Sequence, residues 1–253
     1  MKKQTLILSV VTVSMILFSC SKENLDMPTN EQSINEEMVA PSRPAIDPLS
    51  VKLEGWYTFD RTLRDQTQKL PNAISSAKSV SYDTDRKGKL NSAISFTGTY
   101  HLSIDNVPQQ TNTSISVWVK YSNPVNSLIG VVYGLRGPNV VQLNNEIFAT
   151  MVDDSSSTNG GTTGLQVLDN NWHHVVITSD GTTIKIYADG VLKTTVNYSA
   201  IITPCQITYF VGAQADFPYN WKGSVDDLRF YSRTLTATDV KSLFGASLDT
   251  SVQ

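Results

Sequence analysis

Residues 171–190 read NWHHVVITSDGTTIKIYADG, and this stretch decides the fold. Its apolar run ends at Asp180-Gly181, a dipeptide typical of type I′ β-hairpin turns. Residues 183–187 then alternate polar and apolar side chains, which is the pattern of a strand with one buried face. Asp189-Gly190 supplies a second tight turn before another strand at 191–196. The stretch therefore predicts a three-stranded antiparallel meander.

Further strands are predicted on both sides of this meander. Residues 114–120 (SISVWVK) alternate strictly, and short apolar stretches separated by turn residues recur along the chain. We expect the other strands at 93–96, 206–212 and 224–231. The span from about residue 53 to about residue 246 has the size of one β-sandwich. The sequence therefore predicts an all-β fold in which two antiparallel sheets pack face to face.

One short helix is predicted at the end of the domain. Thr236 is followed three residues later by Asp239, which is a capping-box pattern with Asp in place of the usual Glu. Val240, Leu243 and Phe244 have the spacing of one helical face. We expect this face to pack against one of the sheets.

The beginning of the chain has the features of an exported lipoprotein. Two lysines precede an apolar run at residues 5–18, which is too short to span a bilayer as a helix. Leu17-Phe18-Ser19-Cys20 follows and resembles the bacterial lipobox. The resemblance implies that residues 1–19 are removed as a signal peptide and that Cys20 is acylated. An ordinary secretory signal is the alternative interpretation.

A lipid anchor implies a location outside the cytoplasm. Ser21-Lys22-Glu23 resembles the acidic surface-export signals of lipoproteins in the Bacteroidetes, so we expect the outer membrane and the cell surface. Residues 20–50 are rich in Ser, Asn, Glu and Pro, a composition typical of a mobile tether. The expected organisation is a signal peptide at 1–19, this tether, a folded domain at 51–248 and a tail at 249–253.

Five blocks of the chain, in the right order, resemble laminin G-like domains of the concanavalin A-like family. These blocks are residues 56–65, 90–98, 114–120, 171–190 and 223–239. The resemblance implies that the two-sheet antiparallel sandwich is a jelly roll. It does not define the function, because such sandwiches serve as lectins, carbohydrate-binding modules, adhesion domains and enzymes.

Catalytic residue types are scarce in the predicted domain. Glycoside hydrolysis uses two carboxyl groups that flank one bond, but Glu54 and Glu146 are the only glutamates between residues 51 and 248. His173 and His174 are adjacent, so on a strand they face opposite ways and cannot bind one metal ion together. We therefore expect a binding protein and not an enzyme. A hydrolase or lyase with an unusual site is the remaining enzymatic alternative.

The family resemblance also implies a position for a structural calcium ion, where the first strand of the domain meets the last. Calcium is bound by several carboxylate, carbonyl and water oxygens. Asp60 on the opening strand and Asp226 and Asp227 on the closing strand are the matching carboxylates. The alternative is that Asp226 accepts hydrogen bonds from the backbone or from Arg229 without an ion.

Two segments are candidates for ligand binding. Phe217, Tyr219 and Trp221 gather three aromatic rings in one predicted loop, and aromatic faces stack against sugar rings. The alternative interpretation of Trp221 is that it is buried in the core and does not contact ligand. Asp153 and Asp154 begin a polar, glycine-rich stretch that we expect to be a recognition loop, or else a flexible connector.

The net charge of the chain indicates which kinds of partner it does not bind. Its formal net charge is −3, which argues against a nucleic-acid partner because such a partner calls for a basic surface. Anchor, tether and fold together predict a cell-surface lipoprotein whose non-catalytic domain binds a glycan or polysaccharide. The alternative is a protein-interaction or assembly module of an outer-membrane complex.

Overall fold

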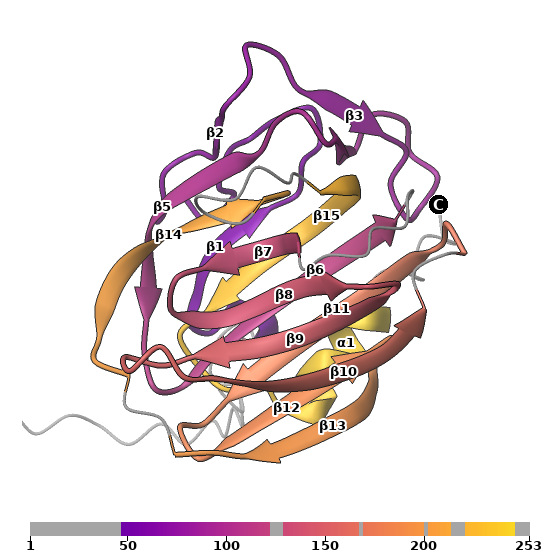
Figure 1. Ribbon diagram of the computed structural model, residues 1–253. Helices are drawn as coiled ribbons and strands as arrows, with labels where there is room; N and C mark the ends of the chain where they lie inside the picture. Colours follow the sequence, from indigo (N-terminus) through magenta and orange to yellow (C-terminus); the bar gives the residue numbers. More distant parts are fainter. Residues whose placement is uncertain (1–46, 122–128, 167–168, 200–201, 214–220, 246–253) are drawn as a thin grey trace, which may run out of the picture. The chain divides into compact units, whose positions relative to one another are not determined.

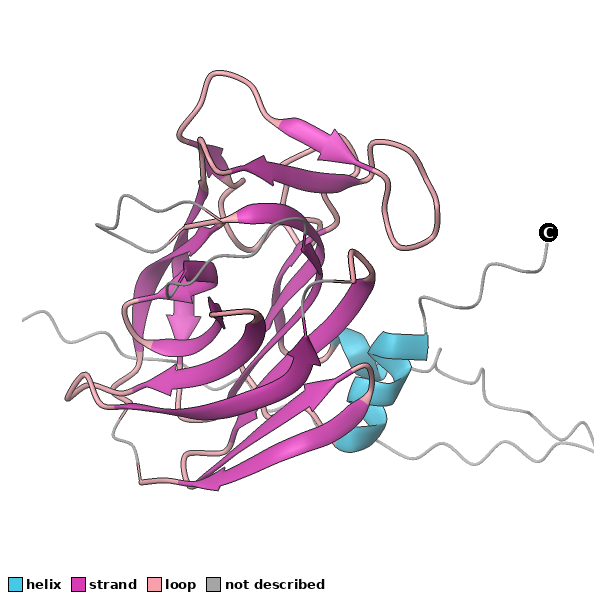
Figure 2. Cartoon of the chain, turned by 45° about the vertical axis from the view of Figure 1, so that its right-hand side comes forward, coloured by secondary structure: helices cyan, strands magenta, loops and turns pink. Residues whose placement is uncertain are grey.

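A computed structural model of the chain describes residues 47–121, 129–166, 169–199, 202–213 and 221–245. These residues form a sandwich of two antiparallel sheets with one α-helix (Figures 1 and 2), as the sequence predicts. No helix among them is long and apolar enough to cross a bilayer. The predicted signal peptide, Cys20 and the tail lie outside the described residues.

The first sheet has eight strands among the described residues. Its order is β13-β12-β11-β6-β15-β4-β3, and β1 pairs with the free half of β15. The strands are β1 (Leu53–Tyr57), β3 (Ser81–Asp83), β4 (Ala93–Thr97), β6 (Thr113–Tyr121), β11 (Trp172–Ser179), β12 (Thr183–Ala188), β13 (Val191–Asn197) and β15 (Lys222–Tyr231). A short 3-10 helix, η1, at Pro48–Ser50 precedes β1.

The second sheet has seven strands among the described residues, in the order β10-β9-β8-β7-β14-β5-β2. The strands are β2 (Ile74–Ser75), β5 (Leu102–Gln109), β7 (Ile129–Gly134), β8 (Gly137–Leu143), β9 (Glu146–Val152), β10 (Thr158–Gln166) and β14 (Cys205–Val211). Both sheets draw strands from both halves of the domain. The order of strands therefore alternates between distant parts of the sequence, as in a jelly roll.

The predicted meander is confirmed as β11-β12-β13. The Asp180 amide donates to the Thr183 carbonyl at 3.3 Å and closes the first turn. Only Gly181 has a positive φ there, at 87°, so this turn is not the type I′ turn that the sequence predicts. Asp189 and Gly190 form the second turn with φ angles of 50° and 75°, the left-handed conformation that a type I′ turn requires. Asp-Gly is suited to this turn because Asp tolerates positive φ and Gly has no Cβ.

The hydrophobic core lies between the two sheets. Its largest fully buried side chains include Tyr57, Phe59, Ile94, Leu102, Ile104, Ile115, Ile147, Met151, Ile177, Tyr209 and Trp221. Each such aliphatic side chain contributes about 1.5–3 kcal/mol by leaving water. This core fixes the register of the strands, because a slip by one residue would turn the buried face of a strand outward.

The predicted C-terminal helix is α1 (Ala237–Gly245), and its capping box is present. The Thr236 amide donates to Asp239 Oδ2 at 2.8 Å, and the Asp239 amide donates to Thr236 Oγ1 at 3.1 Å. Val240 and Leu243 pack with Tyr187 in a second apolar cluster on the outer side of the eight-stranded sheet. The helix therefore covers part of that outer face (Figure 2).

The polar stretch after Asp153 is not the long loop that the sequence predicts. Residues 158–166 form the strand β10, which pairs with β9. Gly160 permits this pairing because a Cβ there would approach the Ala149 carbonyl oxygen on β9 to 2.2 Å. A Cβ at Gly161 would approach Thr194 on β13 to 2.6 Å. The lack of a side chain at these two glycines thus allows close packing of the strands. The sequence-based prediction interpreted the same glycines as a sign of a loop.

Candidate functional site

The fold brings the three predicted calcium ligands together. Asp60, Asp226 and Asp227 line one pocket of about 220 Å³ beside the turn of residues 85–89. The turn supplies three cationic side chains to the same pocket, including Arg86. The expectation that the first and last strands of the domain meet is correct, since β1 pairs with β15. Asp60 does not lie on the opening strand as predicted, because β1 ends at Tyr57.

The groups in this pocket do not fit a calcium ion. Arg86 bridges Asp226 and Asp227, with an Nη2–Oδ2 distance of 2.7 Å to Asp227. Lys89 Nζ lies 2.8 Å from Asp60 Oδ1. A guanidinium and an ammonium group thus take the position expected for the ion. Across the part of the chain that the structure describes, no group of three or more His, Cys, Asp or Glu side chains has the arrangement of a metal site.

Burial changes the ionisation of an acidic side chain in this cluster. Desolvation raises the pKa of Asp226 to about 7, although Arg86 opposes the shift. Asp227 accepts hydrogen bonds from Trp56 Nε1 and from Arg229 Nε, the latter at 3.2 Å. The expected hydrogen bond between Arg229 and Asp226 is absent among the described residues. Arg229 pairs with Asp227, and Asp226 pairs with Arg86. The cluster ties β1, β15 and the 85–89 turn together and has a structural role.

Trp221 is a core residue, so the prediction that it contacts ligand does not fit its position. Its side chain has no exposed surface, and its Nε1 donates to Gln142 Oε1 at 3.1 Å. Its ring lies about 6 Å from the rings of Phe96 and Tyr121. Phe217 and Tyr219 lie outside the described residues.

Asp153 and Asp154 stabilise the turn between β9 and β10. Asp153 Oδ1 accepts hydrogen bonds from the amides of Ser155 and Ser157, both at 2.9 Å. Asp154 binds the Arg136 guanidinium at 3.2 Å and the Thr203 amide at 2.9 Å. Both carboxylates are therefore engaged within the fold, and their contact with a ligand stays a prediction.

The two adjacent histidines have separate environments, as the strand pattern predicts. His173 lies between Asp189 and Asp169, at 2.9 and 3.0 Å, and the Asp189 hydrogen bond raises its pKa. His174 is buried, which lowers its pKa to about 3, and its Nε2 meets Ser116 Oγ at 2.8 Å. Its Nδ1 has no partner among the described residues, so a Ser-His-acid arrangement is not assembled.

The outer face of the seven-stranded sheet carries a row of aromatic side chains. Phe210 on β14 lies directly opposite Tyr133 on β7 and Ser103 on β5. Their neighbours Tyr209, Val132 and Leu102 are fully buried, so by strand alternation these three side chains point away from the core. Phe210 and Tyr133 are both partly exposed.

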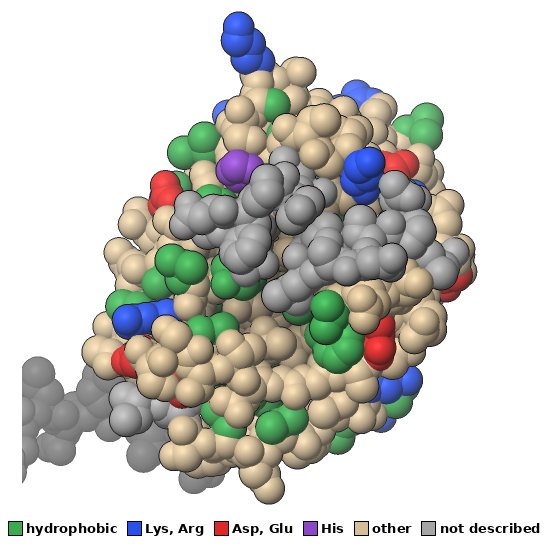
Figure 3. Space-filling view, in the orientation of Figure 1, with side chains coloured by type: hydrophobic (Ala, Val, Ile, Leu, Met, Phe, Trp, Pro, Cys, Tyr) green, Lys and Arg blue, Asp and Glu red, His purple; other side chains and the backbone are tan. Residues whose placement is uncertain are grey.

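We call the outward-facing rings of this sheet the aromatic face (His101, Tyr133, Phe148 and Phe210), with β8 lying between the strands of Tyr133 and Phe148. The His101 ring meets the Phe210 ring at 5.6 Å in an edge geometry. Phe148 on β9 is partly exposed between the buried residues Ile147 and Ala149. In Figure 3, which looks onto this sheet, the charged atoms that are coloured lie mostly toward the margin. Asp105, two residues from Ser103 on β5, accepts a hydrogen bond from Thr208 at 2.6 Å and adds a carboxylate to this side of the sheet.

Sequence reasoning missed the aromatic face, although a signal for it exists. In residues 205–211 (CQITYFV), alternation puts Ile207, Tyr209 and Val211 inward, which leaves Phe210 as an aromatic at an outward position. Tyr133 has no such signal, because a bulge in β7 shifts the alternation of its strand.

The architecture defines the class of protein: a jelly-roll sandwich of the type shared by lectins and glucanases. The chain belongs to the concanavalin A-like lectin/glucanases superfamily, since the laminin G-type family model with that description matches residues 96–241, more than half of the chain. No curated protein matches the sequence.

Several solved structures share the fold. Domain 4 of AbnA, an extracellular arabinanase from Geobacillus stearothermophilus, was solved in complex with arabinotriose; it superposes with a TM-score of 0.64 at 21% identity, over 76% of this chain and 98% of that one. The botulinum neurotoxin serotype D ligand-binding domain, in complex with N-acetylneuraminic acid, superposes with a TM-score of 0.62 at 16% identity. The match covers 77% of this chain and 51% of that one. The binding domain of Paraclostridial Mosquitocidal Protein 1 superposes with a TM-score of 0.62 at 15% identity, over 78% of this chain and 53% of that one. The chain thus spans about half of each toxin domain.

Proposed function

We propose that the protein is a lipid-anchored cell-surface protein whose sandwich binds carbohydrate without cleaving it. The observation that carries this proposal is the aromatic face, where Phe210 and Tyr133 lie side by side on adjacent strands. Sugar rings present C–H groups that pack on aromatic faces, and their hydroxyl groups pair with nearby polar side chains such as Ser103. Neighbouring rings on one side of a sheet suit an extended chain of sugars.

The positions of the two glutamates in the domain support binding over catalysis. Glu54 belongs to β1 of the eight-stranded sheet, where it accepts a hydrogen bond from Ser232. Glu146 belongs to β9 of the other sheet. Two groups on different sheets do not flank one glycosidic bond, which hydrolysis requires. The similar arabinanase and neurotoxin domains, both solved with saccharides bound, are consistent with the same role.

Removing the central rings of the aromatic face is expected to weaken glycan binding. Phe210→Ala and Tyr133→Ala should each lower the affinity about tenfold, because each removes an apolar surface for a sugar ring. The measurement is titration calorimetry with a neutral oligosaccharide selected on a panel of plant, host and microbial glycans. Trp172→Ala, which truncates a partly exposed ring on the other sheet, is the matched control. Equal losses in all three variants would exclude the aromatic face as the site.

Loss of the lipid-bearing cysteine is expected to release the protein from the membrane. Cys20→Ala should move the protein from the membrane fraction to the soluble fraction and abolish labelling with an alkyne fatty acid, since no acyl chain remains to bury. Cys205→Ala removes the other cysteine and should leave both readouts unchanged. Persistent fatty-acid labelling of the Cys20 variant would contradict the proposed anchor.

A further inference from the structure

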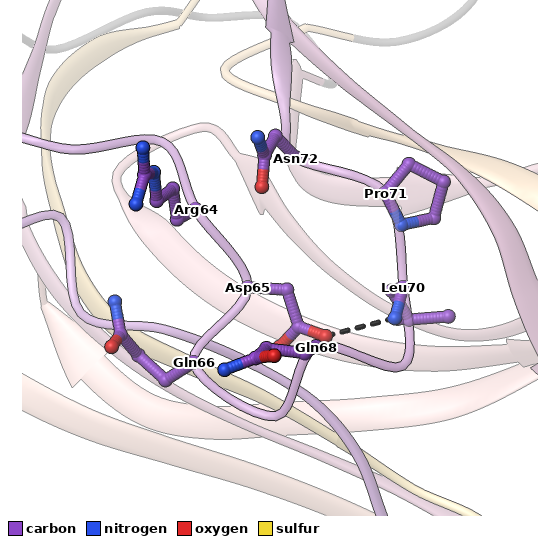
Figure 4. Close-up of a pocket in the computed structure, with 7 residues that line it drawn as sticks. All are labelled: Arg64, Asp65, Gln66, Gln68, Leu70, Pro71 and Asn72. Atoms are coloured by element: carbon purple, nitrogen blue, oxygen red, sulfur yellow. Dashed lines mark hydrogen bonds between the residues drawn. The ribbon is translucent and has the colours of Figure 1, made fainter.

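We infer that the loop of residues 64–72 forms a second saccharide site, which selects sugars that carry a carboxylate. The inference rests on the proposed carbohydrate-binding function and extends it to acidic glycans. The site is an open pocket of about 620 Å³. Its lining residues are Arg64, Asp65, Gln66, Gln68, Leu70, Pro71 and Asn72 (Figure 4).

A buried carboxylate holds this loop in shape. Asp65 is 4% exposed, and its Oδ1 accepts the amides of Trp56 and Thr67 at 2.8 and 3.0 Å. Its Oδ2 accepts the amides of Lys69 and Leu70 at 2.9 and 2.8 Å. Figure 4 shows this carboxylate turned toward the Leu70 amide. The loop is therefore preorganised, and Asp65 is fully engaged within it.

The far end of the loop is also fixed. The Tyr57 hydroxyl donates to the Pro71 carbonyl at 2.7 Å. Leu70 packs against Gly55, where an added Cβ would approach its Cδ1 to 2.5 Å. The pocket thus keeps its opening without a ligand, which lowers the entropic cost of binding.

The groups that remain available suit an acidic sugar. Arg64, Gln66, Gln68 and Asn72 are exposed, and their side chains have no hydrogen-bond partner among the described residues. Arg64 and Asn72 extend to the same side of the loop in Figure 4. Amide groups both donate to and accept from hydroxyl groups, and a guanidinium pairs with a carboxylate through two parallel hydrogen bonds.

The charge balance points in the same direction. The negative charge of Asp65 is shielded by its hydrogen bonds within the loop, whereas the Arg64 guanidinium faces solvent at the pocket. A ligand with a carboxylate beside hydroxyl groups satisfies both the cation and the amides. A neutral sugar would leave the guanidinium without a charged partner, and binding of such a sugar gains less from this site.

The test compares acidic sugars with their uncharged methyl esters. Trigalacturonate and sialyllactose are each titrated into the purified protein as the free acid and as the ester, with calorimetry at moderate salt. We expect at least one free acid to bind about tenfold more tightly than its ester, as one charge-assisted bidentate contact allows. Equal affinity of acid and ester for both sugars would overturn the inference.

Variants then assign the effect to the pocket. Arg64→Gln should reduce the acid-over-ester preference to about twofold or less, because it removes the guanidinium and keeps a polar side chain. Lys193→Gln removes one exposed positive charge on β13 and should leave the preference intact. Equal loss in the two variants would attribute the preference to overall charge and contradict the pocket.

These outcomes separate the two proposals. The protein could bind a neutral glycan in a way that depends on Phe210 and show no preference for acids over esters. That result would overturn the inference about the pocket and would still support the aromatic face as the binding site. An acid preference that depends on Arg64, without any effect of Phe210→Ala, supports the pocket and removes the aromatic face as the principal site.

Discussion

Replacing Arg86 with methionine is expected to destabilise the protein by about 4 kcal/mol. Arg86 bridges Asp226 and Asp227, and the exposed fractions of the three side chains are 9%, 4% and 11%. Its removal leaves two buried carboxylates without their shared cation, which costs several kcal/mol in comparable sites. Its contact with the Trp118 ring, at 5.0 Å, is lost as well. Urea unfolding at neutral pH measures the effect.

The loss should depend on pH with a defined sign. The pKa of Asp226 is raised from 3.8 to about 7 in the folded protein, so this group contributes stability at low pH that is lost as the pH rises through 7. Arg86 opposes that rise, and without it the pKa of Asp226 increases further. The destabilisation by Arg86→Met should therefore be smaller at about pH 5 than at about pH 8.

Two further variants make this prediction falsifiable. Adding Asp226→Asn to Arg86→Met should recover about 1–2 kcal/mol at about pH 8, because it removes an unpaired buried charge. Lys89→Met breaks the exposed pair with Asp60 in the same turn and should cost less than about 1 kcal/mol. A loss for Arg86→Met no larger than that for Lys89→Met would show that the cluster does not stabilise the fold.

Replacing Asp65 with alanine is expected to cost about 3 kcal/mol. Its carboxylate accepts four backbone amides and the Thr67 hydroxyl, the last at 2.6 Å. Alanine provides no acceptor, so several partly buried donors lose their partner at once. Thermal and urea unfolding of the two proteins measure the difference.

Asp180→Ala is the matched control for this variant. Asp180 also organises a turn through the amides of Thr182 and Thr183, at 2.9 and 2.7 Å, but its surroundings are exposed. Water can replace its hydrogen bonds, so we expect a loss of about 1 kcal/mol. Losses of equal size would mean that burial of Asp65 adds nothing to the stability of the loop.

Local chemistry explains which parts of the fold could be predicted from sequence. The meander follows from two Asp-Gly turns between alternating strands, and α1 follows from the Thr236–Asp239 capping box. Both signals lie within a few residues. β10 was predicted as a loop because its glycines and threonines have little strand character, and pairing with β9 overrides that preference.

The candidate sites depend on contacts between distant residues. Arg86 meets Asp226 across 140 positions of the chain, so the sequence predicted the acids but not the cation that binds them. The aromatic face joins β14 to β7 and β9, and nothing local indicates that their rings share one surface. Trp221 illustrates the reverse case, since its aromatic neighbours in sequence favoured a surface site and the packing of two sheets buries it.

The most direct test of glycan binding at the aromatic face is a map of amide chemical shifts during titration of the isotope-labelled protein with its best neutral glycan. We predict saturable shifts centred on Ser103, Tyr133, Phe148 and Phe210 of the seven-stranded sheet, with the glycan recovered uncleaved. Shifts confined to the eight-stranded sheet, or no saturable shift with any glycan of the panel, would contradict this prediction.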